Sequence, residues 1–272
     1  MLDKKIFQLC NSITEEQALE LDKEKYKANT KWDGERVISV ILDKDVIMFN
    51  RGGKIVNFHF PEIAEELKKL PNCIIDGEII SIDDNFTRLQ SRALTQNKDK
   101  IQALIKEIPC DYMIFDILKI GEEDLRNKPL KERFEKLFNL FVKNFDVLNP
   151  FQFLKVVAYE DIISCLFEAK LKQREGIIIK NMNGLYESRR SDNWKKLKFF
   201  KETILILTKY SPNNAGYRCE DNLNNAVQVS GNQSLEVINK IKTCGSCEVY
   251  IQYLEKTKND KYRFISFRGV KK

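Results

Sequence analysis

The chain has 272 residues, of which 46 are Lys or Arg, 40 are Asp or Glu, and 43% are hydrophobic. This hydrophobic content excludes wholesale disorder, and the length suits one large domain or two smaller ones. The apolar stretches are too short to span a membrane, and the N-terminus lacks the features of a secretory signal. We therefore expect a soluble, cytoplasmic protein.

Charge is distributed unevenly along the chain. Residues 1–175 carry 28 Lys and Arg against 31 Asp and Glu, whereas residues 176–272 carry 18 against 9. A basic C-terminal third on a slightly acidic body favours a polyanionic partner.

The seven cysteines are an odd and scattered set, which is not typical of a disulfide framework. Cys244 and Cys247 form a CxxC pair, which is half of a zinc site, and the single histidine, His59, is remote in sequence. Packing is therefore favoured over a metal or redox role for these residues.

Short β-branched segments predict strands over residues 37–42, 45–49 and 73–80. Between the last two, Ile63, Leu67 and Leu70 recur at helical spacing and predict a helix over residues 60–70. Further helices are expected over residues 89–108, 130–142 and 160–170, the second of which has one continuous apolar stripe.

The C-terminal part shows mainly strand patterns. A strand over residues 176–180 and the segment 193–198 are followed by short strands at 203–210, 225–230, 247–256 and 262–267. A mixed α/β body followed by an all-β module is expected, and a closed barrel is the natural form of such a module.

The first chemically informative segment is KWDGER, residues 31–36. A lysine is a nucleophile only when its ammonium group can lose a proton, which neighbouring positive charge, a metal or desolvation favours. Gly34 permits close approach of the backbone to a ligand. Taken alone, the segment is more simply a charged turn that opens a hairpin.

Other charged or aromatic groups also stand at the ends of predicted strands. They occur in DGE at 76–78, FD at 115–116, EG at 175–176 and in the alternating lysines Lys196 and Lys198. Several strands can direct such groups into one cleft, where carboxylates suit Mg²⁺ and lysines suit phosphate oxygens.

The ordered set KWDGER, FNRGG, IIDGEII, FDIL, EGIIIK and NWKKLK resembles the motif series of the covalent nucleotidyltransferases that include the ATP-dependent DNA ligases. The segments FPEI, FTRLQSR, KPLKERFEKL and LYESRRSDNWKKLK resemble DNA ligases in particular. The resemblance implies an α+β fold in two domains. Residues 1–201 would form an ATP-grasp-like adenylation domain of antiparallel sheets with flanking helices. Residues 202–272 would form a small all-β OB-fold barrel, with no separate N-terminal DNA-binding domain.

The resemblance also implies roles for individual residues. Lys31 would attack the α-phosphate of ATP to form lysyl-AMP and release pyrophosphate, with Lys196 and Lys198 beside that phosphate. AMP would pass to the 5′-phosphate of a nick, and the 3′-hydroxyl would then displace it. Glu175 and Glu78 would hold Mg²⁺ or Mn²⁺. Phe115 would stack on adenine, and the nucleotide-binding positions would be Asp33, Gly34, Arg36, Arg51, Glu78, Phe115 and Arg190.

The sequence departs from the family pattern at two places. Asn29 stands where many relatives carry a glutamate at the adenine region, and the last motif is shortened to SFRGVKK. The candidates for its basic residues, which would orient pyrophosphate, are Arg263, Arg268 and Lys271.

The expected activity is nick sealing by a monomer on double-stranded DNA, with ATP as the AMP donor. An RNA ligase or an mRNA-capping guanylyltransferase, which also use a lysine in KxDG or a related motif, is the alternative within the superfamily. A non-catalytic nucleic-acid-binding adaptor is the alternative from another class, and NAD⁺ is disfavoured as the donor.

Overall fold

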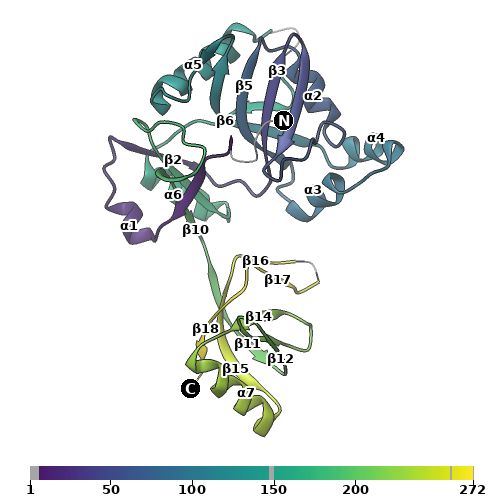
Figure 1. Ribbon diagram of the computed structural model, residues 1–272, viewed down its shortest axis with the longest axis vertical. Coiled ribbons are helices and arrows are strands. Elements are labelled where there is room, and N and C mark those ends of the chain that lie inside the picture. Colours follow the sequence, from purple (N-terminus) through teal and green to yellow (C-terminus); the bar gives the residue numbers. More distant parts are fainter. Residues whose placement is uncertain (1–5, 147–149, 258, 272) are drawn as a thin grey trace. The chain divides into compact units, whose positions relative to one another are not determined.

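The computed structural model describes residues 6–146, 150–257 and 259–271, and the chain divides into two compact units between Leu197 and Lys198 (Figure 1). Each unit has its own buried apolar core. The sequence predicts this boundary between residues 201 and 202, and the division in the structure lies slightly earlier.

A six-stranded sheet is the centre of the first unit, in the order β4-β3-β5-β6-β7 with β8 beside β6. Its strands are β3 (Glu35–Leu42), β4 (Asp45–Asn50), β5 (Cys73–Ser81), β6 (Cys110–Ile120), β7 (Glu123–Asp124) and β8 (Leu154–Val156). All neighbours are antiparallel except β6 and β8. Because side chains alternate along a strand, Val37 and Ile41 enter one core cluster and Ile38 enters another.

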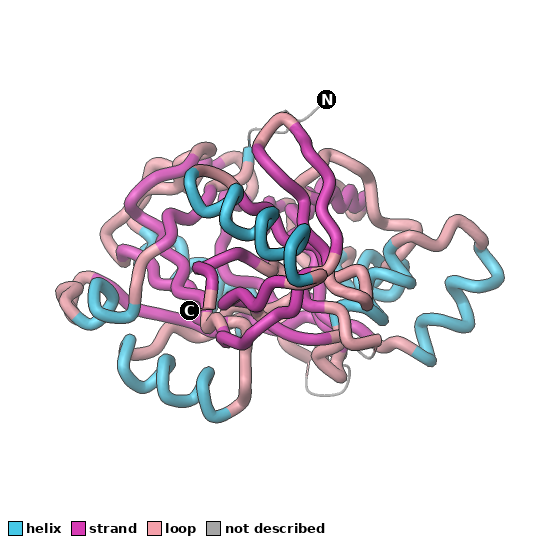
Figure 2. The backbone as a smooth tube through the Cα atoms, turned by 90° about the horizontal axis from the view of Figure 1, so that it is seen from below, coloured by secondary structure: helices cyan, strands magenta, loops and turns pink. Residues whose placement is uncertain are grey.

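Four helices accompany this sheet: α2 (Pro61–Leu67), α3 (Phe86–Ala93), α4 (Lys98–Glu107) and α5 (Leu130–Lys143). Figure 2 separates the helices, in cyan, from the strands, in magenta. Ile63 and Leu67 of α2, Leu89 of α3 and Leu137 of α5 are fully buried in the cluster that also contains Val37.

The single helix expected over residues 89–108 is wrong, because α3 and α4 are separate helices (Figure 1). The side chain of Asn97 accepts hydrogen bonds from the backbone N–H groups of Asp99 and Lys100 and so caps the start of α4. The apolar pattern continues across this break, which is why periodicity alone joins the two helices.

The second sheet of the first unit has the order β1-β10-β9-β2, with β1 (Leu9–Ser12), β10 (Arg190–Lys198), β9 (Gly176–Asn181) and β2 (Tyr26–Thr30). Strand β1 runs parallel to β10. Helix α6 (Ile162–Leu171) packs on β2 and β9, and the short helix α1 (Glu15–Leu19) lies beside α6. Ala28 of β2 and Ile179 of β9 have no exposed surface.

The two sheets meet through a mixed cluster. Phe7, Ile38, Phe49, Leu118, Tyr186 and Trp194 are its buried members. Ile38, Phe49 and Leu118 belong to the large sheet, whereas Trp194 lies on β10. The space between the two sheets therefore brings together side chains from both of them.

The second unit contains two three-stranded sheets around one core. One has the order β11 (Lys201–Leu207), β15 (Cys247–Tyr253) and β18 (Ser266–Val270), and the other β12 (Lys209–Asn213), β13 (Gly216–Glu220) and β14 (Ala226–Val229). A small pair, β16 (Glu255–Lys256) and β17 (Tyr262–Arg263), completes the strands of this unit that the structure describes.

The expectation that this module is all-β is wrong, because it contains helix α7 (Asn232–Cys244). Val237, Ile238 and Ile241 recur at helical spacing and are buried against the strands. Gly245, with φ 76°, ends the helix in the left-handed conformation that glycine adopts readily. Among the described helices, none is long and apolar enough to cross a membrane.

Candidate active site

Lys31 extends the pairing of β2 with β9, since its backbone N–H donates to the carbonyl of Gly176 over 2.9 Å. Its Nζ donates to Oε2 of Glu175 over 2.5 Å, and the Glu175 side chain is only 7% exposed. The lysine amine and the carboxylate that the sequence assigns to metal binding are therefore in direct contact. Asp33, half-buried, lies in the loop that follows.

Gly34 brings that loop against β5. A Cβ at this position would lie 2.2 Å from the carbonyl oxygen of Ile79 and 2.9 Å from Cγ of Glu78. Only a residue without a side chain fits, so Gly34 is explained by close backbone approach. This approach keeps Glu78 near the start of β3.

The pKa of Glu78 is raised to about 8. Burial is the main cause, since it disfavours the carboxylate form, and the nearby carboxylates of Asp76 and Glu175 add to it. The positive charges of Lys31 and Arg36 act in the opposite direction without cancelling the effect. Glu78 is thus a carboxyl group surrounded by too little positive charge.

Because the negative charge of Glu78 is not compensated by its surroundings, Glu78 together with Glu175 fits a divalent cation. Among the described residues there is no group of three or more His, Cys, Asp or Glu side chains that could hold a metal alone. Mg²⁺, however, is commonly bound by one or two carboxylates together with substrate phosphates and water. The pair therefore suits a cation that arrives with a nucleotide.

Arg36 lies deeper than expected for a residue that contacts only the nucleotide. Its guanidinium group makes a two-point ion pair with Asp76, over 3.0 and 2.6 Å, and donates to the carbonyl of Gln8. The hydroxyl of Tyr186 donates to the same carboxylate over 2.7 Å. Although burial opposes it, the charges of Asp76 and Tyr186 raise the pKa of Arg36 above its ordinary value. A nucleotide contact by Arg36 stays a prediction.

Phe115 is the extra residue of a β-bulge. Asp76 pairs with Asp116 and Gly77 with Ile114, which leaves Phe115 without an opposite residue on β5. Bulges re-aim side chains and are common beside active sites. The Phe115 ring meets Trp194 edge to face, with 5.8 Å between ring centroids, and stays partly exposed.

Lys180, the last residue of the EGIIIK segment, is a buried lysine. Its Nζ lies 3.9 Å from the ring centroid of Trp194 and 4.1 Å from that of Phe115, and it donates to the Tyr159 hydroxyl over 2.8 Å. That hydroxyl donates to the carbonyl of Phe115 over 2.6 Å. Burial lowers the pKa of Lys180 to about 7. Lys180 therefore fixes both the ring and the backbone of Phe115.

The remaining candidates, on β10 and in the turn after β4, are more dispersed. Lys196 follows Trp194 at strand spacing on β10 and so shares its side of the sheet, while Lys198 ends the strand. Arg190 is exposed and bonds the carbonyl of Cys10, and Arg51 is exposed in the turn after β4.

The three candidates of the C-terminal motif lie in the second unit and contact residues of that unit. Arg263 pairs with Glu255, Arg268 donates to Gln252, and the Nζ of Lys271 lies 2.6 Å from Glu248. Lys198 has its Nζ 4.2 Å from the ring centroid of Phe264. Cys244 is exposed at the end of α7, and Cys247 is buried in β15.

Sequence reasoning missed several residues that support the site. Asp116 and Arg133 form a two-point ion pair with both side chains fully buried, and Arg92 pairs with Glu62. These four residues lie in FDIL, KPLKERFEKL, FTRLQSR and FPEI, the segments that carry the resemblance. The sequence shows only that the two segments of each pair contain opposite charges. It does not indicate which charged residues contact each other.

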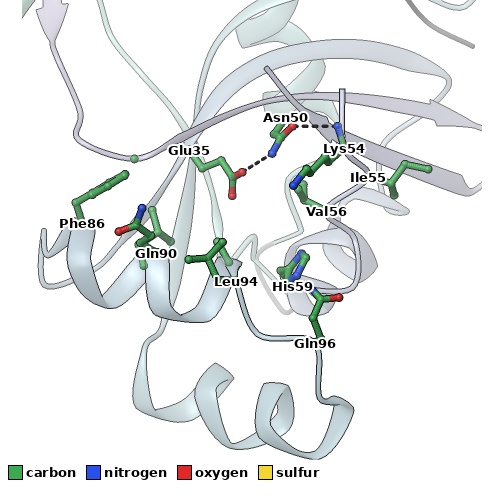
Figure 3. A pocket seen from close by; sticks show the side chains of 13 residues that line it. Glu35, Asn50, Lys54, Ile55, Val56, His59, Phe86, Gln90, Leu94 and Gln96 are labelled. Carbon is green, nitrogen blue, oxygen red and sulfur yellow. Dashed lines mark hydrogen bonds between the residues drawn. The ribbon is translucent and has the colours of Figure 1, made fainter. Parts of the chain in front are cut away.

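A cavity of about 490 Å³ lies between the β3–β4 hairpin and α3 (Figure 3). Glu35 accepts a hydrogen bond from the side chain of Asn50 over 2.7 Å at one end of it, and Phe86 and Gln90 line the α3 side. His59 also lines it and packs edge to face on Phe58. Glu35 is adjacent to Arg36 and points to the opposite side of β3, and Gly34 also lines the cavity.

A family model described as ATP dependent DNA ligase domain matches residues 6–198. The chain belongs to this family. Among curated relatives, the bifunctional non-homologous end joining protein LigD of Bacillus subtilis is 29% identical over 206 residues, which are 70% of this chain and 34% of that protein. A DNA ligase of Nitrosopumilus maritimus is 28% identical over 193 residues, 68% of this chain and 32% of the relative. The chain thus spans about a third of the length of these relatives.

Solved structures of ligases have the same fold. A Lig E DNA ligase aligns with a TM-score of 0.70 and 20% identity, covering 100% of both chains. The ligase domain of M. tuberculosis LigD aligns with a TM-score of 0.60 and 18% identity, covering 97% of this chain and 94% of that one. The mixed α/β architecture is therefore that of DNA ligases.

Proposed function

We propose that this chain is an ATP-dependent DNA ligase that seals nicks in double-stranded DNA through a lysyl-AMP intermediate. The observation that carries the proposal is the contact between the Lys31 amine and Glu175, beside the raised-pKa carboxyl of Glu78. A nucleophilic amine next to two carboxylates suited to a cation matches in-line attack on a phosphate. Membership of the ligase family supports the same reading.

In the first step, the Lys31 amine attacks the α-phosphate of ATP, the N–P bond forms and pyrophosphate leaves. Mg²⁺ bound to the phosphates would neutralise charge that develops there, and Glu78 and Glu175 would hold it. Glu175 accepts the hydrogen bond that orients Nζ, and Lys196 of β10 would meet phosphate oxygens. Phe115, held by Lys180 and Trp194, offers its ring to the base.

In the later steps, the 5′-phosphate of the nick takes AMP from Lys31, and the 3′-hydroxyl then displaces AMP. We assign the adenylation domain to residues 1–201 and an OB-fold to residues 202–272, with α7 as an added helix. The basic excess of residues 176–272 supports contact with DNA phosphates. We propose that the protein acts as a monomer.

The test is nick sealing on a labelled duplex with ATP and Mg²⁺. Joined product, together with an adduct from labelled ATP that is lost in Lys31→Ala, supports the proposal. An adduct from GTP and not ATP would indicate capping-type chemistry, and sealing of nicked RNA alone would indicate an RNA ligase. Binding of nicked DNA without any adduct would leave the adaptor alternative and overturn the proposed activity.

A further inference from the structure

Trp32 and Arg174 are the chain neighbours of the two residues that carry the proposed reaction. Trp32 follows Lys31, and Arg174 precedes Glu175. The guanidinium carbon of Arg174 lies 4.9 Å from the centroid of the Trp32 ring, which is within the range of a cation–π contact. The hydrogen bond between the Lys31 amine and Glu175 therefore has a second contact beside it, made by the next residues along the chain.

The Trp32 side chain is partly buried. Its indole nitrogen is buried and has no hydrogen-bond partner within the described part of the chain. Buried tryptophan N–H groups usually find such a partner, which then fixes the orientation of the ring. The position of this ring is therefore determined by packing and by its contact with the Arg174 cation.

Arg174 itself is held from two sides. Its backbone N–H donates to the carbonyl of Ala169 in α6 over 2.8 Å, and its guanidinium group forms an ion pair with Asp84. The Arg174 side chain is 22% exposed, so solvent screens this pair less than a fully exposed one. Asp84 lies in the turn between β5 and α3, and its backbone N–H donates to the carbonyl of Ser81 over 2.9 Å. Arg174 is thus fixed to a helix and to the turn that follows strand β5.

Trp32 lies in the short segment between β2 and β3. Lys31 still extends the pairing of β2 with β9, through the hydrogen bond of its backbone N–H to Gly176. Strand pairing therefore stops at the nucleophile, and the position of the next side chain depends on the contact with Arg174. In-line attack needs the amine placed opposite the leaving group, and a misplacement of about 1 Å can cost about 100-fold in rate.

We propose that Arg174 is a positioning residue for the Lys31 nucleophile, and that it acts through the Trp32 ring with Asp84 as its anchor. This assignment rests on the proposed function and deepens it. Lys31 forms the N–P bond with AMP in the first step and gives AMP to the nick in the second. The attack of the 3′-hydroxyl in the third step does not use the Lys31 amine as a nucleophile. A contact that places the amine should therefore matter for the first two steps and far less for the third.

The experiment measures single-turnover formation of the Lys31 adduct over a range of ATP concentrations, and single-turnover sealing of a nick that already carries AMP. Wild type is compared with Arg174→Met, which keeps an unbranched side chain and removes its charge, and with Trp32→Ala. We expect each substitution to lower the adduct rate at saturating ATP by about 10–100-fold, because the amine is less well placed. The half-saturating ATP concentration and the rate of sealing should each stay within about threefold of wild type.

Two conservative variants and a double variant separate this contact from general damage to the fold. Arg174→Lys keeps a cation and Trp32→Phe keeps a ring, so each should form the adduct faster than the variant that removes the group. Arg174→Met combined with Trp32→Ala should be about as slow as the slower single variant, because both substitutions remove the same contact. Arg126→Met is the matched control, since Arg126 forms an exposed ion pair with Asp124 and its rates should equal those of wild type.

Equal losses in adduct formation and in sealing would overturn the inference alone, since Arg174 would then hold the whole site or contact DNA. Losses that multiply in the double variant would also overturn it, because Arg174 and Trp32 would then act separately. These first-order rate constants do not depend on the folded fraction of each preparation. Absence of any adduct from ATP in wild type would overturn the proposed function as well.

Discussion

The Lys31 amine is held by Glu175, and Lys31 is not among the residues of the buried core. We expect Lys31→Ala to abolish the adduct with AMP while leaving the thermal unfolding midpoint close to that of wild type. The control is Lys195→Ala, because Lys195 lies on the other side of β10 and pairs with Asp192. Labelled ATP followed by denaturing electrophoresis measures the adduct. Normal labelling of the Lys31 variant would contradict the assignment of the nucleophile.

Glu78 should make the folded state less stable as pH rises. Its pKa is about 8 in the folded protein against an ordinary value of 4.5, so folding takes up a proton between these values and stability is lost as pH increases through this window. We expect the Glu78→Gln variant to lose less stability than wild type between pH 5 and pH 8, by roughly 3 kcal/mol.

Urea denaturation without divalent cations at both pH values measures this difference. Glu65→Gln is the control, because the Glu65 side chain is 70% exposed and should follow wild type. Identical pH dependence in wild type and Glu78→Gln would mean that the carboxyl is already ionised at neutral pH. In that case Glu78 would not need a divalent cation to compensate its negative charge, contrary to our inference.

At the scale of elements, buried ion pairs join the helices to the sheet. Arg133 of α5 and Asp116 of β6 have no exposed side-chain surface, so removing one charge leaves the other buried and unpaired. We expect Arg133→Met to lower the free energy of unfolding by about 3–5 kcal/mol. The exposed pair between Lys136 of the same helix and Glu123 of β7 is the control, and Lys136→Ala should change the free energy of unfolding by less than about 1 kcal/mol. Equal effects of the two substitutions in urea denaturation would contradict the structural role of the Arg133 pair.

The elements that sequence patterns predict best are those whose partners are near in sequence. The strands at 37–42, 45–49 and 73–80 and the helix at 130–142 agree with β3, β4, β5 and α5, because local alternation and helical spacing determine them. Strand β1, in contrast, pairs with β10 across most of the chain, and four residues carry no local signal of this. Helix α7 lies between strand patterns, and the expectation of an all-β module does not take account of the helical spacing of Val237, Ile238 and Ile241.

The candidate site likewise contains residues that local motifs predict and residues whose role depends on distant segments. The motifs locate Lys31, Glu175 and Phe115, and the structure brings Lys31 and Glu175 into contact. They do not reveal that Lys180 supports Phe115, because a lysine at the end of a strand is ordinarily exposed. Its burial depends on Trp194 and Tyr159, which come from separate segments.

At the scale of the whole molecule, the uneven charge predicts how DNA is bound. Residues 176–272 carry 18 Lys and Arg against 9 Asp and Glu, so affinity should come largely from phosphate contacts. We expect the affinity for a nicked duplex to fall by at least tenfold between about 50 and 200 mM salt. Fluorescence anisotropy over this range measures it. An affinity that does not change with salt would contradict a phosphate-dominated interface.

The basic residues of the C-terminal motif should act in only one of the proposed chemical steps. Arg268 and Lys271 lie on and just after β18, where they contact Gln252 and Glu248. A lysine supplies a point charge where an arginine would supply a two-point donor, and both suit a pyrophosphate leaving group. We expect Arg268→Ala and Lys271→Ala to slow adduct formation from ATP by about 10–100-fold.

Phosphodiester formation at a nick that already carries AMP should change far less, because no pyrophosphate leaves in that step. The two steps are therefore measured separately for each variant, with ATP and with a pre-adenylated nick. Lys242→Ala is the control, since Lys242 lies on α7 beside Tyr210 and should affect neither step. Equal losses in both steps for Arg268→Ala or Lys271→Ala would mean that these residues bind DNA or stabilise the second unit. A loss confined to the first step would support a role of Arg268 and Lys271 toward the pyrophosphate leaving group.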